Sequence, residues 1–175
     1  MNKPIAVSVI AIAIFWSGCG GTATETVTVT TESAAKSSHL TSDQVGEMQA
    51  GASKMATALD AYATATGACV DLADLETIDE FAKCPRVAAD ALQPTLAETV
   101  SAVTEMTKGL TADKCQSSLV DYGLSLADLH EAVGLVASRS EARDFDGASS
   151  ASGDVAKLME VTPTNLGTAL TDCIG

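Results

Sequence analysis

The stretch CQSSLVDYGLSLADLHEAVGLV, residues 115–136, decides the fold class of this chain. One set of its apolar residues recurs at alternating intervals of four and three positions: Cys115, Leu119, Tyr122, Leu126, Leu129, Val133 and Val136. In an α-helix such positions lie along one side and form a seam through which helices pack together. The pattern therefore predicts a long helix over about residues 112–140.

The same periodicity continues on the N-terminal side of this stretch. Apolar positions three and four apart predict a helix over about residues 42–66. The capping box Thr41-x-x-Gln44 marks its start, because each side chain can bond a free backbone N–H of the first turn. Gly67 is a plausible stop for this helix.

Residues 67–85 are interpreted as a connector with room for a short helix after Thr77. Pro85 is typical of a first helical residue, so a second long helix is expected from about residue 86 to Gly109. Pro94 lies inside this pattern. Because proline lacks the backbone N–H and crowds the preceding turn, Pro94 is expected to kink or restart the helix.

The chain beyond residue 140 predicts a turn and a further helix. Residues 143–147 interrupt the seam, and Asp146-Gly147 is expected at the corner of the turn. A fourth helical pattern covers about residues 148–161, and Pro163 is expected to interrupt it before a last apolar stretch. Four amphipathic segments with short connections predict an all-α, antiparallel four-helix-type bundle.

Residues 1–18 have the pattern of an export signal. Lys3 supplies a positive charge, and residues 5–16 form an apolar run that is too short to span a bilayer but has the length of a signal-peptide core. The run closes on Trp16-Ser17-Gly18-Cys19, which resembles the lipobox of bacterial membrane lipoproteins. The resemblance implies cleavage before Cys19, lipidation of its sulfur and anchoring to the extracytoplasmic face of the cell membrane. The alternatives are an ordinary secretory signal cut slightly later and an uncleaved anchor.

Residues 19–40 are interpreted as a flexible linker between the lipidated Cys19 and the folded domain. Thr, Ser, Gly and Ala dominate this segment, and its few aliphatic side chains bury too little apolar area to offset the entropy lost on folding. An edge strand is the alternative, because Val27 and Val29 alternate with threonines. The bundle domain is accordingly predicted to be residues 41–175.

Four cysteines lie in the predicted domain: Cys69, Cys84, Cys115 and Cys173. An even number in an exported domain indicates two disulfides. The predicted helix between Cys84 and Cys115 would hold them roughly 37 Å apart, whereas a disulfide requires about 7 Å or less between Cα atoms. An up-and-down bundle therefore predicts the pairs Cys69–Cys84 and Cys115–Cys173, one at each end. Zinc binding is the weaker alternative, because the short C-x₂₋₄-C spacing of zinc sites does not occur.

The sequence offers little material for a catalytic or metal site. His130 is the only histidine of the predicted domain, and it lies beside the seam without the Glu-x-x-His pattern of helical di-metal sites. Five acidic residues between positions 71 and 80 are interpreted as a solvated connector, with a weak cation site or a docking patch for a basic partner as the alternatives. Ser33-x-x-Lys36 matches the serine–lysine pattern of penicillin-binding enzymes, but it lies in the linker without the partner motifs and is discarded. No G-x-S-x-G, phosphate-binding or metalloprotease motif occurs. We therefore expect no enzymatic activity, no metal and no cofactor.

These features predict a non-catalytic, lipid-anchored accessory or binding protein on the surface of a bacterial cell envelope, with an envelope protein as its partner. The alternative is a carrier that holds a small apolar ligand between its helices, or a haem with His130 or a methionine as axial ligand. The net charge of −13 and the aromatic content of 3% exclude a nucleic-acid partner, because phosphates would be repelled and bases would find few rings to stack on.

Overall fold

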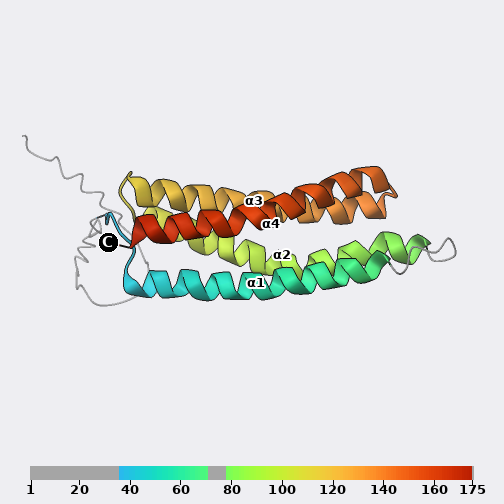
Figure 1. Ribbon diagram of the computed structural model, residues 1–175, viewed down its shortest axis with the longest axis horizontal. Helices are drawn as coiled ribbons and strands as arrows, with labels where there is room; N and C mark the ends of the chain where they lie inside the picture. The colour runs from blue at the N-terminus through green and yellow to red at the C-terminus, as the bar shows by residue number, and fades with distance from the viewer. Residues whose placement is uncertain (1–35, 71–77, 175) are drawn as a thin grey trace, which may run out of the picture. The chain divides into compact units, whose positions relative to one another are not determined.

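The computed structural model describes residues 36–70 and 78–174 of the chain. The export signal, Cys19 and most of the predicted linker lie outside the described residues. Within them the chain forms four α-helices: α1 (Ser42–Val70), α2 (Ile78–Lys108), α3 (Lys114–Glu141) and α4 (Phe145–Cys173). The helices run side by side in alternating directions (Figure 1). The antiparallel four-helix bundle predicted from the sequence is therefore confirmed.

The apolar seam of α3 forms the centre of the bundle. Leu119, Leu126, Leu129 and Val133 are all fully buried, and Tyr122 and Val136 are nearly so. Burying one such side chain contributes about 1.5–3 kcal/mol to folding. Helix α3 packs closely against both α2 and α4, whereas the close packing of α1 is with α2. The seam identified in the sequence thus organises three of the four helices directly.

The start of α1 matches its prediction, and its end does not. The Gln44 backbone N–H donates to the Thr41 hydroxyl at 3.2 Å, and the Thr41 N–H donates to the Gln44 side-chain carbonyl at 2.9 Å. This reciprocal pair confirms the capping box. The helix then continues through Gly67, which was wrongly predicted to end it. A glycine inside a helix costs only about 1 kcal/mol relative to alanine. The extra turn of α1 places Cys69 beside Cys84, with their Cα atoms 5.7 Å apart, so that the disulfide can form.

The predicted start of the second helix is wrong. Helix α2 begins at Ile78 and passes without interruption through Pro85. The short helix expected after residue 77 and the long helix expected from residue 86 are therefore one element. Pro85 is buried and follows the disulfide-bonded Cys84, so tertiary contacts stabilise the helix where proline weakens its hydrogen bonding.

The other two internal prolines do not end a helix either. Helix α2 continues through Pro94, and α4 continues through Pro163 to Cys173. An internal proline costs a helix about 3 kcal/mol. Leu92 and Leu96, which flank Pro94, expose only 1% and 0% of their surface, so burial of this helix face offsets the penalty. The predicted restart at Pro94 and the predicted interruption at Pro163 are therefore wrong.

The turn between α3 and α4 lies earlier than predicted. Arg143 adopts a left-handed conformation with φ 58°, and the N–H groups of Arg143 and Asp144 each donate at 2.9 Å to carbonyls of the last turn of α3. The Asp144 carboxylate then accepts the N–H of Gly147 at 3.0 Å and caps α4. Asp146 and Gly147 consequently lie in the first turn of α4 and not at the corner.

Both predicted disulfides are present, one at each end of the bundle. Cys69 bonds Cys84, and Cys115 bonds Cys173 with a Cα separation of 4.6 Å. The second bond joins the first turn of α3 to the last turn of α4. The bundle is therefore covalently closed at both ends.

The last residues of the predicted linker belong to the bundle. The Ser37 N–H donates to the Gly109 carbonyl at 3.1 Å, and the Thr111 N–H donates to the Ser37 carbonyl at 2.8 Å. The Leu40 N–H donates to the Cys173 carbonyl at 3.2 Å, and the Leu40 side chain is 8% exposed. Free carbonyls at helix ends need hydrogen-bond donors, and these backbone groups supply them. The boundary at residue 41 is therefore too late by at least four residues.

Candidate functional site

The bundle has a cleft along its α1/α4 side. These two helices lie next to each other in Figure 1, yet their backbones hardly approach, in contrast to the other neighbouring pairs. The space between them has a volume of about 450 Å³. All four helices line it, with Tyr62, Ala63, Thr66 and Cys69 from α1, Phe81 and Pro85 from α2, Val136 and Ser140 from α3, and Phe145, Ala148, Ser149, Ser152, Val155, Ala156 and Met159 from α4. We refer to this space as the α1/α4 cleft.

Small side chains on both rims keep the cleft open. Ala63 on α1 and Ser149, Ser152 and Ala156 on α4 line the cleft and are all exposed. Side chains this short cannot bridge two helices that are held apart by the larger residues behind them. The intervals of three and four between residues 149, 152 and 156 place these small residues on one face of α4.

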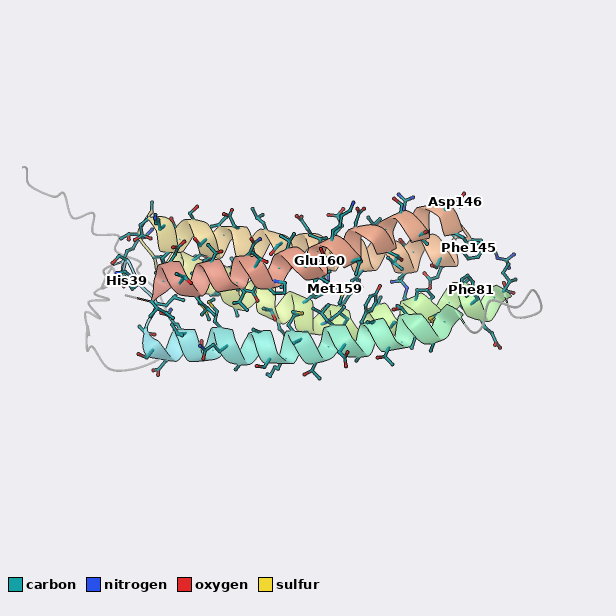
Figure 2. All side chains as sticks on the ribbon, in the orientation of Figure 1. His39, Phe81, Phe145, Asp146, Met159 and Glu160 are labelled. Carbon is teal, nitrogen blue, oxygen red and sulfur yellow. A yellow bond between two sulfur atoms is a disulfide. The ribbon has the colours of Figure 1, made fainter. Side chains whose placement is uncertain are left out.

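One end of the cleft is bounded by an aromatic pair. The rings of Phe81 and Phe145 lie with their centroids 5.4 Å apart at an angle of 49°, at the end of the bundle where α2 begins and α4 begins (Figure 2). The Cys69–Cys84 disulfide ties α1 to α2 at the same end. At this end, α1 is therefore joined to α2 and α2 contacts α4, so the helices are held in place without a direct α1–α4 interface.

Two ion pairs at this end of the bundle lie outside the lining. The Arg86 guanidinium donates to the Glu141 carboxylate at 2.8 Å. This hydrogen bond raises the pKa of Arg86 and lowers the pKa of Glu141. Arg143 similarly pairs with Asp79. These ion pairs link α2 to the α3–α4 turn and leave the cleft itself to uncharged residues.

The hydroxyl groups of the cleft fall into two kinds. Thr66 donates to the Tyr62 carbonyl at 2.8 Å and Ser152 donates to the Ala148 carbonyl at 3.0 Å, so both are satisfied within their own helices. The hydroxyls of Tyr62 and Ser140 make no hydrogen bond to another described residue. Both residues are largely buried, but Thr162 Oγ1 is the one fully buried side-chain oxygen without a partner among the described residues, so these two hydroxyls reach solvent. Burial raises the pKa of the Tyr62 phenol.

The residues singled out in the sequence are distributed over several places. Cys19 lies outside the described residues, and Cys69 is the one disulfide cysteine that lines the cleft. His130 is partly exposed on α3 and is not among the cleft residues. Of the five acidic residues, Asp71, Asp74 and Glu76 lie outside the described residues, while Asp79 and Glu80 are exposed in the first turn of α2. Across residues 36–70 and 78–174, no group of acidic, histidine or cysteine side chains is arranged to hold a metal ion.

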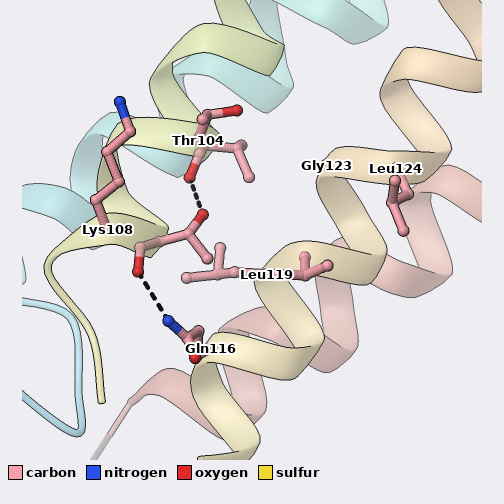
Figure 3. A pocket seen from close by; sticks show the side chains of 9 residues that line it. Thr104, Lys108, Gln116, Leu119, Gly123 and Leu124 are labelled. Atoms are coloured by element: carbon pink, nitrogen blue, oxygen red, sulfur yellow. Dashed lines mark hydrogen bonds between the residues drawn. The ribbon is translucent and has the colours of Figure 1, made fainter. Parts of the chain in front are cut away.

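Two further hollows on the bundle carry charged side chains. A groove of about 340 Å³ between α2 and α3 is lined by Lys108, Leu119, Gly123 and Leu124, and the Gln116 side chain in it donates to the Thr107 carbonyl at 3.2 Å (Figure 3). A second hollow, of about 280 Å³, lies mainly between α1 and α2, and Glu47, Lys54 and Glu98 are part of its lining. The α1/α4 cleft is larger than either and free of such charges.

No motif in the sequence marks the cleft. Its lining includes Val136 of the predicted seam, Tyr62 of the predicted helix 42–66, and several serines and alanines that carry no functional pattern. The available signal was the run of small residues at 149, 152 and 156. Small residues on a helix face are more often a sign of close helix packing, so this signal by itself could not distinguish a cleft from a tight interface.

No protein-family model, curated protein or solved structure matches this chain. Each of the four described helices falls short of the combined length and apolarity needed to cross a membrane. The features that bear on function are therefore the cleft and the sequence that precedes the bundle.

Proposed function

We propose that this chain is a lipid-anchored, non-catalytic binding protein on the extracytoplasmic face of a bacterial cell membrane. The anchor is supported by the apolar run of residues 5–16 and the small residues Ser17 and Gly18 before Cys19. The two disulfides support export, because such bonds persist in oxidising compartments and are rare in the cytosol.

The α1/α4 cleft is the observation that carries the binding function. Its volume of about 450 Å³ lies within the range of small-molecule sites, about 300–1,000 Å³. A mainly apolar lining with a few hydroxyl groups is the usual composition of such sites. The cleft therefore favours a carrier of a small apolar ligand over an accessory protein that acts only through its outer surface.

The cleft does not favour the haem form of the carrier. His130, the histidine considered as an axial ligand, is not among its lining residues, and Met159 is the one methionine that is. The propionates of a haem would also need cationic partners, whereas the cleft lining is uncharged. An apolar molecule without a metal fits the lining better.

The anchor is tested by detergent phase separation of membranes that contain the full chain. We expect the wild-type protein in the detergent phase, and the Cys19→Ala variant either released from the membrane or retained as an uncleaved precursor. Wild-type protein that partitions entirely into the aqueous phase would contradict lipidation.

The binding function is tested by extracting the purified wild-type protein with organic solvent and analysing the extract by mass spectrometry. We expect an apolar molecule in stoichiometric amount, and much less of it from an Ala63→Leu variant, whose larger side chain would fill the rim of the cleft. Equal amounts from both proteins would show that the molecule is bound elsewhere, and the cleft would lose its assigned function.

A further inference from the structure

The α1/α4 cleft is uncharged although the protein as a whole carries a net charge of −13. Its lining contains no Asp, Glu, Lys, Arg or His. Arg86 and Glu141, which each follow a lining residue of the cleft in the sequence, are paired with each other at 2.8 Å. A carboxylate or ammonium group taken into the cleft would lose its water without gaining an opposite charge, which is costly. The lining therefore selects against charged ligands.

The shape of the cleft favours an elongated molecule. Its lining on α4 extends from Phe145 to Met159, a distance of about 21 Å at a rise of 1.5 Å per residue, and its lining on α1 extends from Tyr62 to Cys69, about 10 Å. A roughly spherical space of about 450 Å³ would be shorter than either length, so the cleft is elongated along the helix axes. A single hydrocarbon chain fits such a space better than a broad, fused-ring molecule.

Two hydroxyl groups of the lining are available to hydrogen-bond a polar group of the ligand. Tyr62 on α1 and Ser140 on α3 both line the cleft, and neither hydroxyl is hydrogen-bonded to another described residue. Both hydroxyls reach solvent, so a ligand in the cleft would replace water as their hydrogen-bond partner. Two hydroxyls can donate to and accept from a neutral polar group such as an alcohol, an ester or an amide.

We propose that the α1/α4 cleft binds an uncharged, elongated amphiphile, whose hydrocarbon chain lies along α4 and whose neutral polar group hydrogen-bonds to Tyr62 and Ser140. This inference rests on the proposed binding function and adds the chemical class of the ligand. The inference predicts different binding for two molecules that share one acyl chain. A monoacylglycerol, which is neutral, should bind, and the corresponding fatty acid, which is ionised, should not.

The test is photo-crosslinking of the full chain in its membrane with two probes. One is a monoacylglycerol with a diazirine in its acyl chain, and the other is the fatty acid with the same chain. Label on peptides covering residues 62–69 and 145–159 is measured by mass spectrometry. For each probe the wild-type yield is divided by that of Ala63→Leu in matched membranes, which removes differences in membrane partitioning between the probes. Ala65→Leu, an exposed position of α1 outside the cleft lining, is the matched control.

We expect the monoacylglycerol to label wild-type protein and Ala65→Leu at least about tenfold more than Ala63→Leu, and the fatty acid to show a ratio near one. Tyr62→Phe keeps the ring and removes the hydroxyl. It should lower monoacylglycerol labelling about 2- to 10-fold, which corresponds to the loss of one hydrogen bond. Intact disulfides and a helical circular dichroism spectrum would show that Ala63→Leu is folded. If Ala63→Leu does not fold, Tyr62→Phe still tests the proposal.

The outcomes separate this inference from the binding function. Labelling of the cleft by the fatty acid as strong as that by the monoacylglycerol would overturn the ligand class and leave the binding function standing. Cleft labelling by neither probe would overturn both. An unchanged yield in Tyr62→Phe would overturn the hydrogen bond assigned to that hydroxyl.

Discussion

Two carboxylates show how single residues fix the ends of α3. At the start, Asp113 accepts from the Thr111 hydroxyl at 2.7 Å and from the Gln116 N–H at 3.2 Å, which makes it the cap of the helix. At the end, Glu141 accepts from Arg86 of α2 at 2.8 Å. The Thr111 hydrogen bond lowers the pKa of Asp113, and the Arg86 hydrogen bond lowers the pKa of Glu141.

These shifts predict a loss of stability in acid. A carboxyl group with a lowered pKa in the folded state stabilises the protein above its unfolded-state pKa, and this contribution is lost as the pH falls through the folded-state pKa. The unfolding temperature should therefore fall below about pH 4. Asp113→Asn keeps a capping side chain but cannot ionise, so wild-type protein should exceed it in stability most at pH 7 and least at pH 3. Thermal unfolding from pH 7 to pH 3 measures this, and a constant difference would contradict the role of the charge.

Among the elements, α1 is a helix whose stability could be raised by replacing its glycines. Its glycines Gly46, Gly51 and Gly67 all lie within the helix, and a Cβ atom at any of them would meet no neighbouring atom within 4 Å. Gly147 in the first turn of α4 differs, because a Cβ atom there would collide with the Asp144 carboxylate that caps the helix and with the Arg139 guanidinium. A side chain at position 147 would therefore displace the Asp144 cap and Arg139, whereas one at position 67 would displace nothing.

This difference predicts opposite effects of the same substitution. Gly67→Ala should stabilise the protein by about 0.5–1 kcal/mol, because alanine loses less backbone entropy in a helix. Gly147→Ala should destabilise it by about 1 kcal/mol, because the cap must move away from its N–H partner. Urea unfolding followed by circular dichroism measures both. A destabilised Gly67→Ala variant would show that α1 does not remain helical through that position.

Across the whole molecule, the two disulfides differ in the length of chain that they close. Cys69–Cys84 joins consecutive helices across 15 residues of sequence, whereas Cys115–Cys173 spans 58 residues and holds the two ends of the α3–α4 hairpin together. The Cys173 carbonyl also accepts a hydrogen bond from the Leu40 N–H. At the Cys115–Cys173 end of the bundle, the segment before α1 is therefore joined to α4. The longer loop restricts the unfolded chain more.

Removing each bond in turn should reveal this difference. Replacing Cys115 and Cys173 together by alanine should cost about 4 kcal/mol, and replacing Cys69 and Cys84 should cost about 3 kcal/mol, from the loss of loop-closure entropy. Paired replacement avoids a free thiol in either variant. Urea unfolding of both variants under identical conditions gives the comparison. A larger cost for the Cys69–Cys84 pair would mean that local contacts at that end outweigh loop length.

The sequence by itself determined the helical class, the antiparallel order and the pairing of the cysteines. The spacing of Leu119, Leu126 and Val133 is a local property of the chain, and it places them on one helix face whatever the rest of the protein does. The disulfide pairs followed from helix length, because a long rigid rod keeps Cys84 and Cys115 apart. The same local reasoning located the cap at Thr41 and Gln44.

Only the tertiary structure decided where helices end and where the cleft lies. Pro85, Pro94 and Pro163 weaken a helix by a few kcal/mol each, and whether burial of the neighbouring face offsets that cost depends on partners distant in the sequence. Ser37 and Leu40 look like linker residues in the sequence because the groups that they hydrogen-bond, at the ends of α2 and α4, are distant along the chain. The cleft depends on the separation of α1 from α4, which is set by how α1 packs against α2, α2 against α3 and α3 against α4, and no local pattern encodes that separation.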